Sequence, residues 1–543
     1  MPTLPIDPLD GPKIVLVGRI VCMDKGFTVI KRGVIYVENG NIVAVQDAKA
    51  PLPTGFENIK PVNTLGTIYP GLIELHNHLA YNILRLWNVP KKYGNRDQWS
   101  GTPEYRRLVS GPMTVMGKTP GLLPALVRYV ECKCLLGGVT TSQGIQLFSN
   151  AGVRRFYRGI VRNVEQTDEA DLPEAVTRVD DIEASYAGLF LERLKKQSCF
   201  LLHLSEGVDI KAREHFLALQ LASGGWAVTD ALTGIHCTGL KPADFAVLGS
   251  HGGSMVWSPL SNLLLYGGTA DVAAARSAGV RIGIGSDWSP SGSKNLLGEL
   301  KVAKICAGQG AAFPDRDLVA MATSSAASIL KWDKVLGSIE PGKRADFVII
   351  SGTVGDPYSK LIGAKEKDIR LVMINGVARY GSTTLMSRLG VTGENIRVGG
   401  TTRAVFLSQN TQDPAVSLVS LTYAKEILSD ALARLPELAK ELEKPRLTPR
   451  SMLGEPVPVS WELALDEIYD TGLDLRPRLP LRGGITITGP TRALARASQP
   501  LSTFLSPLTL DPLTSVDDHD LLSRLVGQIN LPSEIKEQLR SLW

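Results

Sequence analysis

The stretch PGLIELHNH, residues 70–78, decides the interpretation of the whole chain. An apolar run of strand type ends here in His76 and His78, which are separated by one residue. Because strand side chains alternate, both imidazoles point to the same side of the strand. Imidazole is the commonest metal ligand near neutral pH, and a catalytic zinc site needs three or four protein ligands. The stretch therefore predicts part of a metal site, whose other ligands must come from elsewhere.

Three further apolar runs of strand type carry polar residues that can bind a metal or move a proton. The run FLLHLSE contains His203 and Glu206, LTGIH ends in His236, and VRIGIGSD ends in Asp287. Stretches of helical character alternate with the strands, and a (β/α) barrel collects its chemistry at the carboxyl ends of its strands. The sequence therefore predicts that these side chains meet at the mouth of one barrel.

The order of these residues is the signature of a known superfamily. His76-x-His78, His203-x-x-Glu206, His236 and Asp287 are followed by GSIEPGKRADFV at residues 337–348. This order closely resembles the amidohydrolase superfamily over about residues 12 to 385. The best match is the mononuclear branch that holds guanine, cytosine and S-adenosylhomocysteine deaminases, triazine hydrolases and imidazolonepropionase.

Two positions depart from the usual pattern of that branch. Glu74 stands where the family usually has Asp, and the motif SPLSN, residues 258–262, replaces the more usual Cys-Pro-x-Ser-Asn. Neither change removes a proposed ligand. Asn262, which closes the second motif, is a candidate substrate-binding residue.

The resemblance implies one divalent metal, with Zn²⁺ as the expected ion. No lysine lies at the end of the strand expected around residues 156–161, where binuclear relatives place a carboxylated lysine that bridges two metals. A single metal is therefore the better interpretation. The ligands implied by the resemblance are His76, His78, His203 and Asp287.

The same resemblance assigns catalytic roles to three residues. The metal would lower the pKa of a bound water enough to provide hydroxide near neutral pH. Glu206 would move a proton from that water to the ring or leaving nitrogen, and His236 would polarise the substrate or stabilise the oxyanion. Asp287 would bind the metal and accept the proton of the water. Glu206 lies three residues after His203, so it reaches the site only if the strand ends there and the chain turns.

The expected function is hydrolysis of a non-peptide carbon–nitrogen bond in a cyclic amidine or amide. Expelled ammonia would make the enzyme a deaminase, whereas an opened ring would make it a cyclic-amide hydrolase of the imidazolonepropionase type. The same groups serve both reactions, so the motif leaves them open. A non-catalytic binding or scaffold protein with the amidohydrolase fold is the third alternative.

The expected fold class is α/β, with a (β/α)8 TIM-like barrel at residues 69–336. Residues 1–68 and 337–400 contain short strands rich in β-branched residues, and neither half has enough strands to bury both faces alone. In the resembling family two such sets form one small composite β-sandwich, into which the barrel is inserted. Residues 401–543 are expected to form a helical extension.

The segment 79–118, which follows the first histidine pair, is dense in aromatic and cationic residues. Such a segment next to a ligand-bearing strand can form a lid that contacts substrate, and its basic residues would favour an anionic or π-rich ligand. Arg96 and Trp99 are its candidate substrate-binding residues. A solvated excursion or a subunit contact is the alternative interpretation.

Composition limits the partners and the compartment. The net charge of +5 (59 Lys and Arg minus 54 Asp and Glu) is too small and dispersed to indicate nucleic acid. The six cysteines contain no Cys-x-x-Cys pair, which is typical of reduced thiols in the cytosol. We find no signal-peptide pattern and no apolar run of transmembrane length. We therefore expect a cytoplasmic enzyme with a small-molecule substrate and no nucleic-acid or membrane partner; homo-oligomerisation remains open.

Overall fold

A nine-stranded sheet combines strands from both sides of the predicted barrel. The computed structural model describes residues 11–150, 152–308, 313–408, 413, 419–444, 460–465 and 499–542. The strand order of the sheet is β18-β19-β17-β16-β15-β4-β1-β2-β3, and β15 pairs antiparallel with β4. Strands of both predicted halves thus belong to one sheet; the sandwich and its boundaries stay predictions. The strands are β1 (Ile14–Val21), β2 (Val29–Glu38), β3 (Asn41–Asp47), β4 (Val62–Pro70), β15 (Phe347–Ser351), β16 (Ile369–Ile374), β17 (Val377–Ser382), β18 (Glu394–Val398) and β19 (Thr401–Val405).

Eight parallel strands lie between the two halves of that sheet. They form the sheets β5-β6-β9 and β10-β11-β12-β13-β14. Backbone hydrogen bonds connect the two sheets at both ends: Ala175 N donates to Val164 O at 2.8 Å, and Asp287 N donates to His76 O at 3.0 Å. The strands therefore follow one another in a ring, as in an α/β barrel. They are β5 (Leu72–Glu74), β6 (Val139–Ser142), β9 (Arg162–Asn163), β10 (Ala175–Arg178), β11 (Cys199–Leu204), β12 (Leu232–His236), β13 (Ser254–Trp257) and β14 (Arg281–Ile284).

The third strand of this ring lies later in the chain than the sequence predicts. The expected strand at residues 156–161 is wrong, because β8 (Arg154–Phe156) pairs antiparallel with β7 (Gln146–Ser149) and the ring strand is β9. The buried carboxylate of Glu131 accepts hydrogen bonds from the backbone N–H groups of Ile160 and Val161. Because these two N–H groups donate to a side chain, they do not form the backbone hydrogen bonds of a strand.

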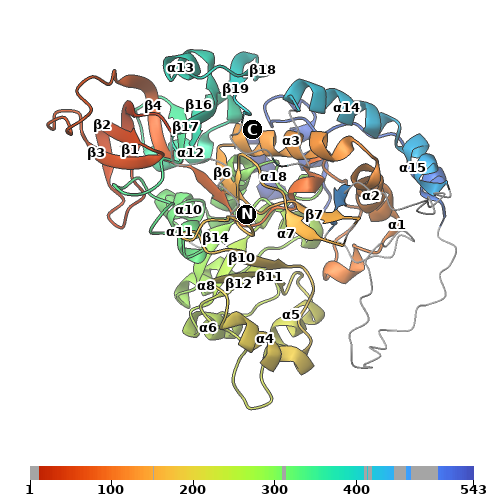
Figure 1. Cartoon of the computed structure of the whole chain (residues 1–543). Helices are drawn as coiled ribbons and strands as arrows, with labels where there is room; N and C mark the ends of the chain where they lie inside the picture. The colour runs from red at the N-terminus through yellow and green to blue at the C-terminus, as the bar shows by residue number, and fades with distance from the viewer. Residues whose placement is uncertain are drawn as a thin grey trace, which may run out of the picture.

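Helices alternate with the parallel strands and cover them from outside (Figure 1). The longest, α3, begins after Gly121, whose φ of 85° lies in the left-handed region. Its polar residues Glu131 and Lys133 are buried together with its apolar ones. The helices of this layer are α3 (Leu122–Leu136), η4 (Ala184–Tyr186), α4 (Ala187–Leu194), α5 (Ile210–Leu217), α6 (Pro242–Ser250), α7 (Pro259–Tyr266), α8 (Val272–Ser277), α9 (Leu296–Gly308), α10 (Asp315–Met321) and α11 (Ser324–Ile329).

The aromatic segment 79–118 folds into short helical turns that pack into the body of the molecule. Trp87, Tyr93 and Tyr105 are buried, and Trp99 is only 6% exposed. This packing disagrees with a solvated excursion, because buried aromatic rings supply its core contacts. Its elements are η1 (Leu79–Ile83), η2 (Arg96–Gln98), α1 (Pro103–Tyr105), η3 (Arg106–Ser110) and α2 (Gly111–Lys118).

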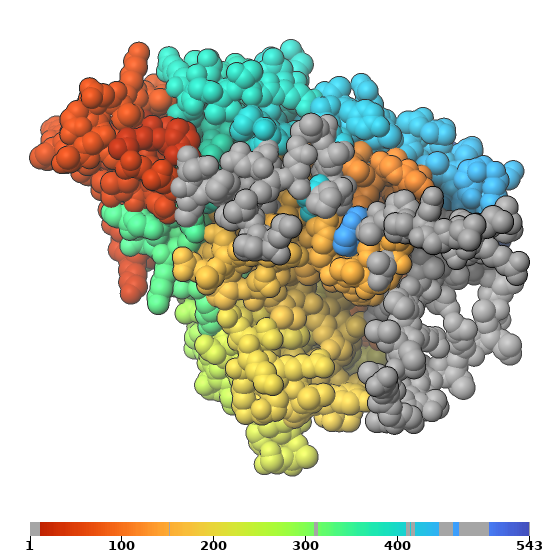
Figure 2. All heavy atoms as spheres, in the orientation of Figure 1, coloured from red at the N-terminus to blue at the C-terminus, as the bar shows by residue number. Residues whose placement is uncertain are grey.

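The described parts of residues 401–542 contain the helices α14 to α18 together with short strands and irregular stretches. Helix α14 packs on α3, and α18 packs on α9. Figure 1 places β1 to β3 at one end of the molecule and α14 and α15 at the other, and both ends are surface features in Figure 2. Among the described residues, no helix combines the length and apolar character needed to cross a membrane. The remaining elements are α12 (Pro357–Gly363), η5 (Glu366–Asp368), α13 (Thr383–Arg388), α14 (Leu421–Ala433), α15 (Leu435–Glu443), β20 (Trp461–Leu463), α16 (Leu501–Phe504), α17 (Leu521–Gly527) and α18 (Ser533–Leu542).

Candidate active site

Left-handed backbone turns carry the candidate residues over the mouth of the parallel strands. Ser205, His236 and Asp287 have φ angles of 53°, 68° and 65°. Non-glycine residues adopt this region at a cost, and such residues cluster at functional sites. Strand β11 ends at Leu204, and the turn at Ser205 brings Glu206 into the cavity at the mouth. Glu206 thus reaches the site through the chain turn that its spacing from the strand required.

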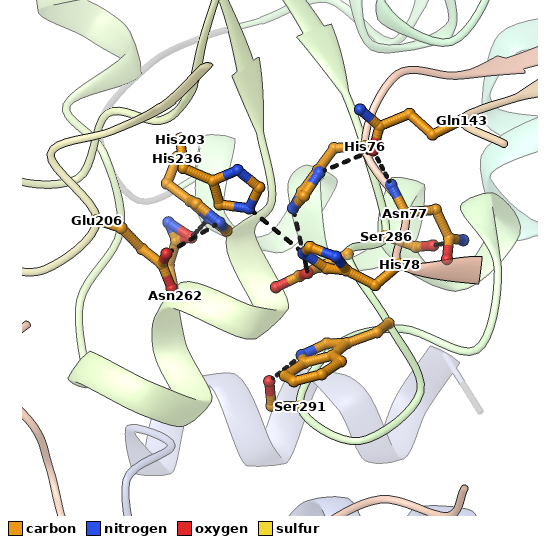
Figure 3. A network of polar contacts seen from close by, with 12 residues as sticks. His76, Asn77, His78, Gln143, His203, Glu206, His236, Asn262, Ser286 and Ser291 are labelled. Atoms are coloured by element: carbon orange, nitrogen blue, oxygen red, sulfur yellow. Dashed lines mark hydrogen bonds and ion pairs between the residues drawn. The ribbon is translucent and has the colours of Figure 1, made fainter. Parts of the chain in front are cut away.

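The four predicted metal ligands lie close together, and Figure 3 labels the three histidines among them, His76, His78 and His203. Asp287 Oδ1 lies 3.1 Å from His76 Nε2 and 3.5 Å from His78 Nε2. His203 Nε2 lies 3.3 Å from His78 Nε2. Four side chains from β5, β11, β14 and the turns after them thus direct their ligand atoms at one small volume.

The outer hydrogen bonds of two imidazoles identify which ring nitrogens are free to bind a metal. His76 Nδ1 lies 3.1 Å from Gln143 Oε1, and that oxygen also accepts from Asn77 N at 2.9 Å. His203 Nδ1 lies 3.2 Å from the carbonyl oxygen of Arg178. Oxygen acceptors require a proton on each Nδ1, so both Nε2 atoms carry lone pairs. Lone pairs facing a carboxylate and another imidazole fit a divalent cation between them.

The buried electrostatics favour the same protonation states. Burial lowers the pKa of His76 and lowers the pKa of His203 well below its usual range. Burial is the largest single influence on Asp287 and acts to raise its pKa, but His76, His236 and His78 together lower the pKa overall. At neutral pH His76 and His203 are therefore neutral imidazoles and Asp287 is an ionised carboxylate, which are the forms that bind metal.

Glu206 and His236 stand beside the ligand cluster. Glu206 Oε2 lies 3.8 Å from His236 Nε2, and its Oε1 accepts a hydrogen bond from the Tyr266 hydroxyl at 2.7 Å. His236 Nδ1 lies 3.1 Å from Asn262 Oδ1. Asn262 is fully buried behind His236 and does not line the cavity, so its geometry suits orienting that imidazole. Trp99 Nε1 donates to the Tyr266 hydroxyl at 2.9 Å and thereby supports Glu206 from a distance.

A cavity of about 240 Å³ opens above these groups. Its walls include Trp99, Tyr105 and Trp288. The ring centroid of Trp288 lies 6.1 Å from that of Trp99 and 6.1 Å from that of Tyr105. Flat aromatic walls suit a planar substrate ring. The full lining is His78, Tyr81, Arg96, Asp97, Trp99, Ser100, Tyr105, Val179, Asp180, Asp181, His203, Glu206, His236, Asp287 and Trp288.

Arg96 lies in the cavity wall, but its charge is bound by the protein. Its guanidinium donates to Val179 O at 2.7 Å and to Asp181 at 3.2 Å, and lies 3.7 Å from Glu206. The lining contains five carboxylates and this one guanidinium. The expected preference for an anionic ligand therefore loses its main support, because the cationic group is already paired and carboxylates outnumber it.

Sequence reasoning missed Gln143, Tyr266 and Trp288. Gln143 directly follows strand β6, a strand-end position of the kind that identified His203 and Asp287. Trp288 follows Asp287 directly, and a search of strand-end neighbours would have found both. Tyr266 ends helix α7, 60 residues from the carboxylate that it binds, and no local signal marks it.

Comparisons with known proteins agree with this geometry. A model of the amidohydrolase family matches residues 207–379. A 5-methylthioadenosine/S-adenosylhomocysteine deaminase of Thermoanaerobacter pseudethanolicus is 33% identical over 383 residues, covering 63% of this chain and 87% of the relative. A protein of the same name from Teredinibacter turnerae is 30% identical over 334 residues, covering 54% of this chain and 75% of the relative.

Two solved structures have a similar fold. A mutant atrazine chlorohydrolase of Arthrobacter aurescens TC1, complexed with zinc and atraton, has 18% identity and a TM-score of 0.52, covering 69% of this chain and 99% of its own. Guanine deaminase of E. coli has 16% identity and a TM-score of 0.50, covering 67% of this chain and 99% of its own. At these identities the likeness concerns the fold alone.

Proposed function

The chain belongs to the amidohydrolase family of hydrolases that act on carbon–nitrogen bonds, and from that premise we propose that it is a metal-dependent deaminase of a planar cyclic amidine. The observation that carries the proposal is that His76 belongs to two triads of possible metal ligands, one with His78 and Asp287 and one with His203 and His236. Glu206 lies beside them, 3.8 Å from His236. The relatives named as deaminases support loss of ammonia over ring opening.

One divalent cation would complete this site. When bound, it would lower the pKa of a coordinated water so that the water can attack near neutral pH. The solved relative that is named as a zinc complex supports Zn²⁺ as that ion. His76, His78, His203 and Asp287 would hold it, and the neutral Nε2 atoms suit zinc as ligands.

Three side chains would handle protons and charge in the reaction. Glu206 would carry a proton from the water to the ring nitrogen or to the departing amino group, and the Tyr266 hydroxyl at 2.7 Å would hold its carboxylate in place. Asp287 would accept the proton of the attacking water. His236 would stabilise the negative charge on the oxygen that is added to the reacting carbon, and Asn262 would fix the orientation of the His236 ring.

The cavity also limits the charge of the substrate. With Arg96 bound to Asp181 and near Glu206, the lining keeps an excess of carboxylates even after a divalent cation is added. An added anion would face repulsion in a partly desolvated site. The substrate is therefore a neutral or cationic planar ring that carries an amino group.

The domain organisation follows the family. Residues 69–336 would form the (β/α)8 barrel, and residues 1–68 and 337–400 would form the composite sandwich on one side of it. The pairing of β15 with β4 supports this union of the two terminal parts. The remaining residues, 401–543, would form the extension.

Purified full-length chain tests the proposal. Elemental analysis should find one divalent metal per chain, and incubation with amino-substituted purines, pyrimidines, pterins and triazines should release ammonia from at least one ring class. Removal of the metal with a chelator should stop that release, and added Zn²⁺ should restore it. Turnover without ammonia would replace deamination by ring opening, and a chain that binds no metal would overturn the enzymatic account.

A further inference from the structure

The C-terminal tail, defined as residues 499–542, inserts charged residues into the body of the molecule. Asp511 is 2% exposed, and it lies between two buried lysines of the strand-and-helix body. Its carboxylate lies 2.5 Å from Lys133 Nζ on α3 and 2.7 Å from Lys294 Nζ. Asp518 of the tail also binds Lys294, at 2.9 Å. Within the described part of the chain, the carboxylates that pair with these two lysines all belong to the tail.

The contacts of Lys133 continue from the tail toward the metal ligands. Its ammonium group donates to Asn82 O at 2.7 Å and to Ser289 Oγ at 3.1 Å. The Asn82 side chain accepts from Ser289 N at 2.7 Å and donates to Asn77 Oδ1 at 2.8 Å. Every step of this chain of contacts is buried.

The two residues of this network that lie farthest from the tail, Asn77 and Ser289, border the site. Asn77 lies between His76 and His78 in sequence, and it forms an isolated parallel bridge with Asp287. Ser289 lies two residues after Asp287, on the turn that carries the Trp288 wall of the cavity. The network therefore ties the two strand ends that supply three of the four metal ligands.

We propose that Asp511 is a positioning residue, which holds Lys133 in place and thereby fixes the Asn82 contacts that align the strand ends of His76, His78 and Asp287. The tail is thus part of the active-site framework. The inference rests on the proposed metal site but extends it to residues outside the cavity. Such supporting contacts tune metal affinity because they orient the ligands before the ion arrives.

The backbone of the tail is docked at the same place, so Asp511 has a fixed position. Asp511 N donates to Ile83 O at 2.9 Å, and the Tyr129 hydroxyl donates to Asp511 O at 2.5 Å. Asp518 anchors the tail through Lys294 and through Arg85, each at 2.9 Å, and among the described residues it forms no hydrogen bond or ion pair with Lys133. Asp518 therefore provides a matched control: a buried tail carboxylate in the same cluster that lies outside the network to Asn82.

The test measures zinc affinity of the full chain after metal removal, by calorimetry or by competition with a chelator. Asp511→Asn should raise the zinc dissociation constant about tenfold, the lower end of the range for supporting residues, whereas Asp518→Asn should change it less than about twofold. Thermal unfolding of both variants calibrates the general loss of stability. Equal weakening of zinc binding in the two variants, or no weakening in either, would overturn the positioning role.

A double variant covers the case in which Asp511→Asn does not fold. Lys133→Met with Asp511→Leu removes both members of the pair and leaves Lys294 paired with Asp518, so no charge is buried alone. It should fold and bind zinc about tenfold more weakly than the wild type. Wild-type zinc affinity in this variant would overturn the proposal. Failure of the proposed function is separate, because it would appear as a wild-type chain that binds zinc but releases no ammonia.

Discussion

Gln143→Leu should weaken metal binding without touching a metal ligand. Gln143 Oε1 accepts from His76 Nδ1 at 3.1 Å and from Asn77 N at 2.9 Å. Leucine fills similar space but offers no acceptor, so the proton on His76 Nδ1 loses its partner. The imidazole can then carry its proton on Nε2, which lies 3.1 Å from Asp287 Oδ1 and can donate a hydrogen bond to it. A metal would have to displace that proton before binding.

The size of the effect follows from the bonds that are lost. A buried hydrogen bond contributes about 0.5–1.5 kcal/mol net, and leaving its donor unpaired costs about 1–3 kcal/mol. Only the bond to His76 bears directly on the ligand nitrogen, so the metal dissociation constant should rise about tenfold to a hundredfold. The bond to Asn77 adds to the loss of stability of the apo chain.

Zinc titration of the metal-free protein measures this change, with Gln143→Glu as the control that retains an oxygen acceptor. The leucine variant should bind zinc more weakly and the glutamate variant close to the wild type. Unchanged zinc affinity in Gln143→Leu would refute the assignment of the His76 proton to Nδ1, and with it the argument that Nε2 is the ligand atom.

Three further predictions concern proton transfer, pH and substrate charge. Glu206→Gln keeps a partner for the Tyr266 hydroxyl but cannot carry a proton, so kcat should fall about 10²- to 10⁴-fold with unchanged metal content; near-normal kcat would exclude Glu206 as the proton carrier. Burial raises the pKa of Glu299 to about 8, so between about pH 4.3 and 8 this carboxyl group is protonated in the folded chain and ionised in the unfolded chain. The free energy of unfolding of the wild type therefore falls as the pH rises through this range. From pH 5 to 8 the free energy of unfolding of Glu299→Gln should therefore rise by a few kcal/mol relative to that of the wild type, which can be followed as a difference in Tm. A Tm difference that does not change with pH would contradict a buried, protonated Glu299. Among amino-substituted rings that turn over, a phosphate-bearing analogue should have kcat/KM on the order of tenfold below its neutral counterpart, and a preference for the phosphate would show that Arg96 is free to bind anions.

The candidate ligands could be proposed from the sequence because strand periodicity is a local property and because their order resembles a known family. Alternation along a strand predicts that His76 and His78 point to the same side, and in the structure both lie just beyond β5, which ends at Glu74. His203 and Asp287 mark strand ends that the apolar pattern makes visible. The turn that delivers Glu206 also followed from its spacing to His203. These inferences needed no knowledge of distant contacts.

The supporting network depends on contacts that local patterns do not encode. Asp511 meets Lys133 across 378 residues of chain, and only the folded chain brings them together. Strand β9 has two residues, too few for a periodic signal, which explains why the strand was expected earlier. The pairing of Arg96 with Asp181 could not be predicted for the same reason, and it removes the main support for an anionic ligand because the charge of Arg96 is already bound by a carboxylate.

We propose that His76, His78, His203 and Asp287 hold a single divalent cation. A crystal structure of the zinc-loaded chain, with anomalous scattering at the zinc edge, would locate that ion. We expect one anomalous peak within bonding distance of His76 Nε2, His78 Nε2, His203 Nε2 and Asp287 Oδ1. Zinc bound elsewhere, or no peak among these four atoms at saturating zinc, would contradict it.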